Sequence, residues 1–415
     1  TDPMQDKEPQ THGVLLRARN GDVIGFDETG LRMNLSDSVI ADIHRRLPEA
    51  GDVTLDPAVL GDVDAWNLRQ HGEWYVFSAN LPGAQGPRQF RRRVQADADA
   101  SAPDIIADTP GAVYALLALG GARRAVTANE RLSFPYHVVT TGDDLGPAGA
   151  AGTERNAATG LMQRLTEQTR DSLIADEILR RRQAQHRALP LIYARSETDA
   201  AASVAALAEG AAFTNFAQTV ANLSAAGRSV GKPVKVLAVS LDFTLEDVIS
   251  TGPEWTVGMY RLMTRITDLF AEYSIRKPLF TAVFDAGSCD ISDTAVLRAQ
   301  WELAWNKGGH DHVYTAPGYM FAQDEFGRPT PAARIEMAEM DAHAIEAYNS
   351  DAPWSCPVLL LAEREADGKV IRCRGQAMGA LTIDADDPLN AGESCGFRFA
   401  GDTSAARIMD VRVDT

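Results

Sequence analysis

Two adjacent carboxylates, Asp143 and Asp144, stand where this chain could place a reactive group. They follow the apolar and β-branched run 136–141 and lie in a turn between Gly142 and Gly146. A buried strand that ends in a tight glycine turn can lift a nucleophilic hydroxyl to the carboxyl edge of a parallel sheet. Aspartate takes the place of the serine that such chemistry needs. The turn therefore has the layout of a nucleophile site without its nucleophile.

Further carboxylates follow the other apolar segments and predict an acidic rim, whose members are Asp143, Asp144, Glu197, Asp199, Asp242, Glu246, Asp247, Asp285, Asp290 and Asp324. Carboxylates are ligands for hard divalent cations and accept hydrogen bonds from sugar hydroxyls. The same side chains also cap helices, because aspartate is favoured at the amide-rich end of a helix. We favour caps, expect no cofactor, and keep a divalent cation as the alternative.

Aromatic residues near the same predicted edge could supply the apolar half of a glycan site. Aromatic faces stack on sugar rings, while polar groups fix the orientation of the sugar. The predicted glycan-binding residues are Asp143, Asp144, Asp247, Trp255, Tyr319, Phe321 and Asp324. The pair Trp301 and Trp305, spaced i and i+4, is expected in the core instead.

The elements that must position these side chains alternate along residues 134–349. Apolar runs predict strands over 134–141, 189–195, 234–241, 278–284 and 312–316. Helices are predicted within 154–186 and over 200–226, 256–274, 293–306 and 330–348. Strands that are apolar on both faces and alternate with helices indicate an α/β fold with a doubly wound, parallel, five-stranded sheet. Asp144 and Asp324 are then expected on adjacent loops at its carboxyl edge.

The two flanking regions have other patterns, so we expect three domains in the 415 residues. Residues 351–415 contain short strands between Gly, Asp and Asn turns, which is typical of a small β-sandwich. Residues 1–133 mix a hairpin, a capped helix and a stretch rich in Pro, Gly and Ala, and are interpreted as an N-terminal mixed adaptor region. The central domain spans 134–350.

The turn at 142–146 and its surroundings resemble the first block of the SGNH/GDSL hydrolases, specifically the sialate O-acetylesterase-like carbohydrate esterases. In that family the first strand ends in Gly-Gln-Ser followed by Asn or Leu, and Gly142, Asp143, Asp144 and Leu145 align with these positions. The resemblance implies an SGNH or flavodoxin-like sheet, a sugar-accommodating cleft and a Ser-His-Asp esterase mechanism. The short strands predicted within residues 351–415 resemble the β appendage that follows the catalytic core in several such esterases.

The remaining blocks of that family are altered at the positions that do chemistry. Arg195 lies in the segment where the family has an oxyanion-hole glycine, only Asp247 is kept from Trp-x-Gln-Gly-Glu-x-Asp, and the Asp-x-x-His block keeps Asp324 but has Arg328 near the histidine position. Arginine cannot accept a proton at neutral pH, and each lost part of the triad costs orders of magnitude in rate. No catalytic residue is therefore expected, and the degenerate positions are Asp144, Asp324, Arg328 and Arg195.

Composition limits the partners. The net charge of −17 argues against nucleic-acid binding, and neither a membrane-spanning apolar segment nor an export signal is visible. We expect a soluble chain, cytoplasmic or on a virion.

Two classes of function remain. The first is a catalytically degenerate protein that binds a surface polysaccharide, as a homo-oligomer or as part of a larger assembly. A tail, spike or fibre component of a phage or phage-like particle is the example, because such domains are associated with these particles. The alternative is an active carbohydrate O-acetylesterase, or a metal-assisted hydrolase that uses the acidic rim.

Overall fold

The computed structural model describes most of the chain, namely residues 12–18, 21–27, 30–47, 49, 51–95, 103–154, 156–199, 202–242, 250–285, 295–318, 321–322, 324, 328–356, 358–364, 370–378, 381–385, 397–401 and 406–414. It divides into two compact units, Thr1–Val53 and Thr54–Thr415, which are described separately. None of the described helices combines the length and the hydropathy needed to cross a membrane.

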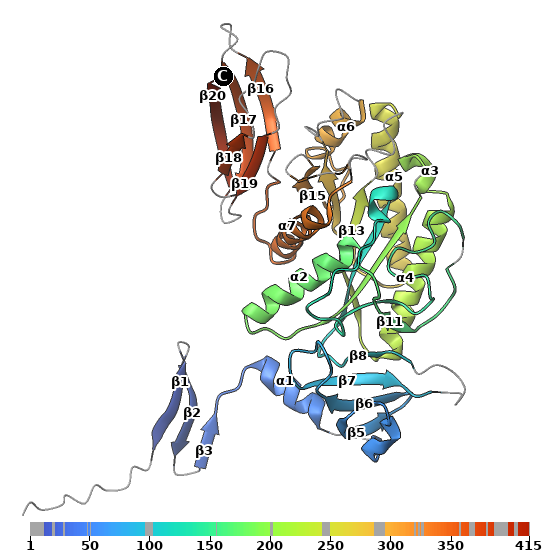
Figure 1. Ribbon diagram of the computed structural model, residues 1–415, viewed down its shortest axis with the longest axis vertical. Coiled ribbons are helices and arrows are strands. Elements are labelled where there is room, and N and C mark those ends of the chain that lie inside the picture. Colours follow the sequence, from blue (N-terminus) through green and yellow to red (C-terminus); the bar gives the residue numbers. More distant parts are fainter. Residues whose placement is uncertain are drawn as a thin grey trace, which may run out of the picture. The chain divides into compact units, whose positions relative to one another are not determined.

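The N-terminal unit contains a small antiparallel sheet and one helix (Figure 1). Its elements are β1 (Gly13–Ala18), β2 (Gly21–Asp27), β3 (Gly30–Met33) and α1 (Asp37–Arg46). The Ser36 side chain caps α1 by accepting from the Val39 amide, as an N-cap serine should. Large apolar side chains stay exposed on both the sheet and the helix, including Leu15, Leu16, Leu31, Met33, Ile40 and Ile43. This unit buries little of its own apolar surface.

The second unit begins with a five-stranded sheet in the order β4-β5-β6-β7-β8. Its strands are β4 (Val53–Thr54), β5 (Ala65–His71), β6 (Trp74–Ala79), β7 (Arg88–Arg93) and β8 (Ile105–Ala107), with the short helix η1 (Pro57–Leu60) between the first two. Phe77 and Phe90 are fully buried in its core. Tyr136 packs edge-on against Phe90, with the ring centroids 5.1 Å apart. The small sheet therefore packs against the segment that leads into β10 (Val138–Thr141).

A seven-stranded sheet forms the centre of this unit, in the order β11-β10-β12-β9-β13-β14-β15. The strands are β9 (Val113–Gly120), β10 (Val138–Thr141), β11 (Met162–Arg164), β12 (Leu191–Thr198), β13 (Val234–Asp242), β14 (Phe280–Phe284) and β15 (His312–Pro317). β11 pairs antiparallel with β10, and the other neighbours are parallel. All the strands predicted for the central domain are present, but β9 and β11 enlarge the sheet beyond the predicted five.

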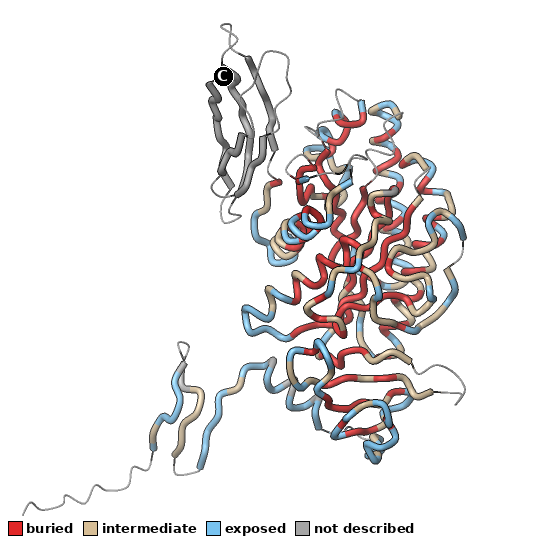
Figure 2. The backbone as a smooth tube through the Cα atoms, in the orientation of Figure 1, coloured by how far each residue is buried: buried red, intermediate tan, exposed pale blue. Residues whose placement is uncertain are grey.

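Helices cover both faces of this sheet. One face packs against α3 (Val204–Leu207), α4 (Ala211–Ser229), α5 (Gly252–Glu272) and α6 (Ala295–Leu303), and the other against α2 (Arg170–Ala184) and α7 (Pro331–Asn349). Along β9, Ala115 and Leu117 join the first core, whereas Leu116 joins the second. Burial on both faces explains why the strands are continuous apolar runs. In Figure 2 the buried colour runs along the strands of this sheet.

The position of β9 corrects the predicted domain boundary. β9 pairs with β12 on one side and β13 on the other, so a boundary at 133/134 separates this strand from the sheet to which it belongs. Numbered by sequence, β12-β9-β13-β14-β15 has the order 2-1-3-4-5 that is known from flavodoxin-like sheets. β9 is therefore the strand at which the order reverses.

The strand order also corrects the predicted proximity of Asp144 and Asp324. Asp144 follows β10 and Asp324 follows β15, which lie toward opposite edges of the sheet. Five strand spacings of roughly 4.8 Å separate these two strands, or about 24 Å. The two loops are not adjacent, and they do not build one site.

The C-terminal strands are antiparallel, and they match the five short strands predicted after residue 351. β16 (Val358–Arg364), β17 (Val370–Met378) and β20 (Ala406–Asp414) form one sheet, and β18 (Leu381–Ala385) pairs with β19 (Phe397–Gly401).

Candidate functional site

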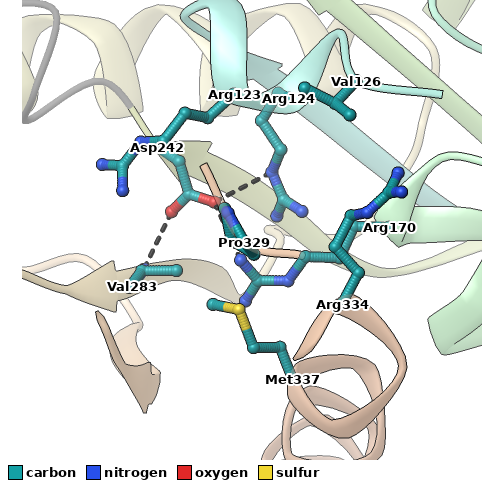
Figure 3. A pocket seen from close by; sticks show the side chains of 9 residues that line it. All are labelled: Arg123, Arg124, Val126, Arg170, Asp242, Val283, Pro329, Arg334 and Met337. Atoms are coloured by element: carbon teal, nitrogen blue, oxygen red, sulfur yellow. Dashed lines mark hydrogen bonds and ion pairs between the residues drawn. The ribbon is translucent and has the colours of Figure 1, made fainter. Parts of the chain in front are cut away.

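A small cavity lies where the carboxyl ends of β9, β13 and β14 meet, with a volume of about 20 Å³ (Figure 3). Its charged lining residues are Arg123, Arg124, Arg170, Arg334 and Asp242, and its apolar walls are Val126, Val283, Pro329 and Met337. In open α/β sheets, ligands bind at the carboxyl edge where the strand order reverses. The cavity can hold a group of only a few atoms, because a single water molecule already needs about 10–15 Å³.

The end of β9 delivers two of these arginines. A side chain at Gly120 would lie 2.7 Å from the carbonyl oxygen of Asp242, so the close approach of β9 to β13 requires glycine. The Gly121 amide donates to the same carbonyl oxygen at 3.0 Å, and the helix η2 (Ala122–Arg124) begins immediately afterwards. Arg123 and Arg124 are thereby held at the reversal point of the sheet.

The Asp242 carboxylate is the anionic centre of the cavity. Arg124 Nε lies 2.9 Å and Arg170 Nη1 3.7 Å from its Oδ2, and Figure 3 shows both guanidinium groups beside it. The Val283 amide donates to Oδ1 at 2.8 Å. Burial alone would raise the pKa of Asp242, but Arg124 and Arg170 outweigh burial, so this pKa lies below its ordinary value. The carboxylate is charged and already occupied.

Arg170 is fully committed to a structural ion pair. It is the first residue of α2, and its Nε and Nη2 donate to the two carboxylate oxygens of Asp341 on α7 at 2.6 and 2.7 Å. Burial would lower the pKa of Arg170, but Asp341 and Asp242 outweigh that effect and raise it above its ordinary value. This bidentate pair joins two helices that cover one face of the sheet.

Arg124 and Arg334 keep unused donors. Their side chains are 3% and 7% exposed. Within the described part of the chain, Nη1 of Arg124 and both Nε and Nη1 of Arg334 have no hydrogen-bond acceptor. The Glu130 carboxylate lies 3.7 Å from Nη2 of Arg334. Buried N–H groups of a charged side chain are costly to leave without acceptors.

Asp143 and Arg195 are brought together, but as a buried structural pair. Arg195 Nη1 and Nη2 donate to the Asp143 carboxylate at 3.0 and 2.9 Å, and Nε donates to Glu197 at 2.8 Å. The side chains of Asp143 and Arg195 are 1% and 0% exposed. Asp143 therefore ties the 142–146 turn to β12 and offers no free oxygen to a glycan. Asp144 is exposed beside it, in the left-handed region with φ 61°.

The other predicted site residues that the structure describes do not line the cavity. Asp324 and Arg328 pair with each other at 2.8 Å after β15. Trp255 and Phe321 are 2% and 9% exposed, so neither presents an open ring face to a sugar. Asp247 and Tyr319 lie outside the described residues.

The tryptophan pair differs from its predicted place in the core. Trp301 on α6 is 40% exposed and Trp305, just after this helix, is 62% exposed, with the ring centroids 5.2 Å apart. As for metals, no group of at least three His, Cys, Asp or Glu side chains that could hold an ion occurs among the described residues. The divalent cation stays a prediction.

Sequence reasoning missed the arginines of the cavity, although one signal pointed to them. The run 113–119 is continuously apolar and ends in Gly120 and Gly121, which is a strand followed by a tight turn. Arg123 and Arg124 come directly after this turn. The run lies within residues 1–133, the predicted adaptor region.

Comparisons with known proteins give distant structural likenesses. No protein-family model and no curated protein matches the chain. A protein of Arabidopsis thaliana shares 11% identity over 56% of this chain and 98% of its own, with a TM-score of 0.41. A carbohydrate acetylesterase from Xanthomonas citri shares 15% identity over 84% of this chain and 79% of its own, with a TM-score of 0.39. NanS shares 10% identity over 59% of this chain and 100% of its own, also with a TM-score of 0.39. At these TM-scores the likenesses decide nothing about function, which has to be argued from the site.

Proposed function

We propose that this chain keeps a carbohydrate-esterase-like fold and binds a surface glycan without hydrolysing it. The observation that carries the proposal is the distribution of histidine. No histidine occurs in the segments that follow the carboxyl ends of the parallel strands, which are 121–136, 142–161, 199–203, 243–251, 285–294 and 318–330. A serine esterase needs a base beside its nucleophile. None of these segments can supply an imidazole to serve as that base.

The strand ends support the same conclusion. The esterase family that the sequence resembles has Gly-Gln-Ser at the end of its first strand. The strand at the reversal point ends at Gly120 and is followed by Gly121 and Ala122, and alanine has no hydroxyl. Asp144, which the sequence aligned with that serine, follows β10 instead. Neither of the two residues aligned with that serine, Ala122 and Asp144, has an alcohol hydroxyl.

A hydroxyl–imidazole contact does occur elsewhere in this unit. Thr264 Oγ1 lies 3.2 Å from His310 Nε2. His310 precedes β15, so this contact belongs to the amino ends of the parallel strands, opposite the cavity. It therefore does not supply a base to the reversal point.

The test is an assay of the purified full chain on O-acetylated sugars and on a small chromogenic acetate, together with a glycan array. We expect no turnover above the protein-free blank and saturable binding to at least one surface polysaccharide. Turnover that scales with protein concentration would contradict the proposal. If a chelator abolished that turnover, the metal-assisted alternative would take its place, and if it did not, an unassigned nucleophile would be responsible.

Display in an assembly is a second part of the proposal. The apolar side chains exposed on residues 12–47 are of the kind that is covered in oligomers. Several weak glycan sites on one particle also give useful avidity. We propose a tail, spike or fibre component of a phage-like particle, on the family association alone. Light scattering of the full chain should show an oligomer, and a monomer at all concentrations would remove this part.

A further inference from the structure

We propose that the cavity at the ends of β9, β13 and β14 binds the carboxylate of an acidic sugar through Arg124 and Arg334. The inference rests on the proposed glycan-binding function and names the class of glycan. It begins from the buried donors that no described residue satisfies, which are Nη1 of Arg124 and both Nε and Nη1 of Arg334. Both side chains line the same cavity. A bound oxyanion would accept hydrogen bonds from both guanidinium groups.

The cavity has a surplus of hydrogen-bond donors but no large surplus of positive charge. Each lining arginine has a carboxylate nearby, in the pairs Arg123 with Asp285, Arg124 with Asp242, Arg170 with Asp341 and Arg334 with Glu130. Long-range attraction of anions is therefore weak. Selectivity would come from short, charge-assisted hydrogen bonds inside the cavity, which are stronger than hydrogen bonds between neutral groups.

Two helix ends add favourable potential. Arg170 is the first residue of α2, and Pro329 on the cavity wall lies two residues before α7, whose N-cap is Thr330. The amide-rich ends of both helices thus lie near the cavity, and such ends favour negative charge. These ends support the arginine donors and do not make the site by themselves.

Size and shape favour a carboxylate over a whole sugar ring. A volume of about 20 Å³ admits a small group, while Val283, Pro329 and Met337 provide apolar walls. A guanidinium group matches the two oxygens of a planar carboxylate in a forked arrangement. The pyranose ring would then lie at the mouth of the cavity, with its carboxylate inserted.

The test compares methyl glucuronide with methyl glucoside, because the two probes differ only in the carboxylate. Ligand-observed NMR titration of the full chain should show saturable binding of the glucuronide and binding of the glucoside at least tenfold weaker. Arg334→Gln and Arg334→Lys should each weaken glucuronide binding by about tenfold or more, since loss of the fork removes charge-assisted bonds. Arg180→Gln, on the exposed side of α2, removes the same charge and should leave binding unchanged.

Each other outcome has a defined meaning. Equal binding of the two methyl glycosides would overturn the carboxylate assignment and leave the glycan-binding function standing. Inorganic phosphate that bound more tightly than the glucuronide, with loss in Arg334→Gln, would assign the site to a tetrahedral oxyanion and overturn the sugar acid. Binding to a neutral glycan on the array, with no response to any anion, would mean that water fills the cavity. Circular dichroism checks that the variants fold, and the two probes decide the question on the wild type alone.

Discussion

Replacing Asp143 should destabilise the protein, whereas the same replacement at its neighbour should not. Asp143→Asn removes the charge from a buried carboxylate that accepts two hydrogen bonds from Arg195, at 3.0 and 2.9 Å. It also turns amide hydrogens toward a guanidinium group that has only donors. Breaking a buried ion pair costs about 3–5 kcal/mol. Arg195 keeps Glu197 as a partner, so we expect about 3 kcal/mol, or roughly 100-fold in the folding equilibrium.

Asp144→Asn is the matched control, because it makes the same chemical change one residue later. Asp144 is exposed with φ 61°, a conformation that asparagine also tolerates, so its loss of charge should cost less than about 0.5 kcal/mol. Urea unfolding at pH 7, followed by tryptophan fluorescence, compares the midpoints if the slopes agree. Equal losses in the two variants, or a loss below about 0.5 kcal/mol for Asp143→Asn, would refute the structural role.

Three further measurements test the structure and the site. Burial lowers the pKa of His312 from 6.5 to about 3, so the unfolded chain binds this proton more readily than the folded chain. The free energy of unfolding should therefore fall by about 1.4 kcal/mol per pH unit as the pH drops from 6.5 toward 3. His312→Phe should remove this slope from urea melts taken between pH 6.5 and 4.5. Gly149→Ala, at φ 65°, places a methyl group against the Glu197 carboxylate. Gly231→Ala has nearly the same backbone angle, φ 67°, but open space around it, and should lower the free energy of unfolding by about 1 kcal/mol. Gly149→Ala should lower it clearly more. Glucuronide binding should be flat from pH 6 to 8, because arginine does not titrate there.

The strands and helices that the sequence predicted are those whose local pattern leaves little choice. The runs 189–195 and 234–241 are apolar on both faces, and the structure has β12 and β13 there. Strand order is a long-range property, which periodicity does not record. β10 follows β9 along the chain, yet β12 lies between them in the sheet. The predicted site was therefore built on a strand near the edge.

Two carboxylates of the predicted acidic rim, Asp143 and Asp242, are paired with buried arginines. Arginine is usually exposed, so nothing in the sequence indicates that Arg195 is fully buried against Asp143. The same holds for Arg124, which lies beside Asp242 with 3% of its side chain exposed. Carboxylates that appear free for a metal or a sugar are already paired in these two cases. The residue types could be read from the sequence, but their pairing required the fold.

The proposed loss of esterase chemistry and the proposed recognition of anions depend on the same property of arginine. A base must release and accept a proton during the reaction, and a guanidinium group does neither at neutral pH. It does hold several donors in a fixed plane at constant charge. Arg123 and Arg124 follow β9, the strand at which the order reverses, and Arg334 lies in the first turn of α7. Arginines at this cavity therefore fit the binding of an acidic sugar that we propose, and they do not fit the work of a catalytic base.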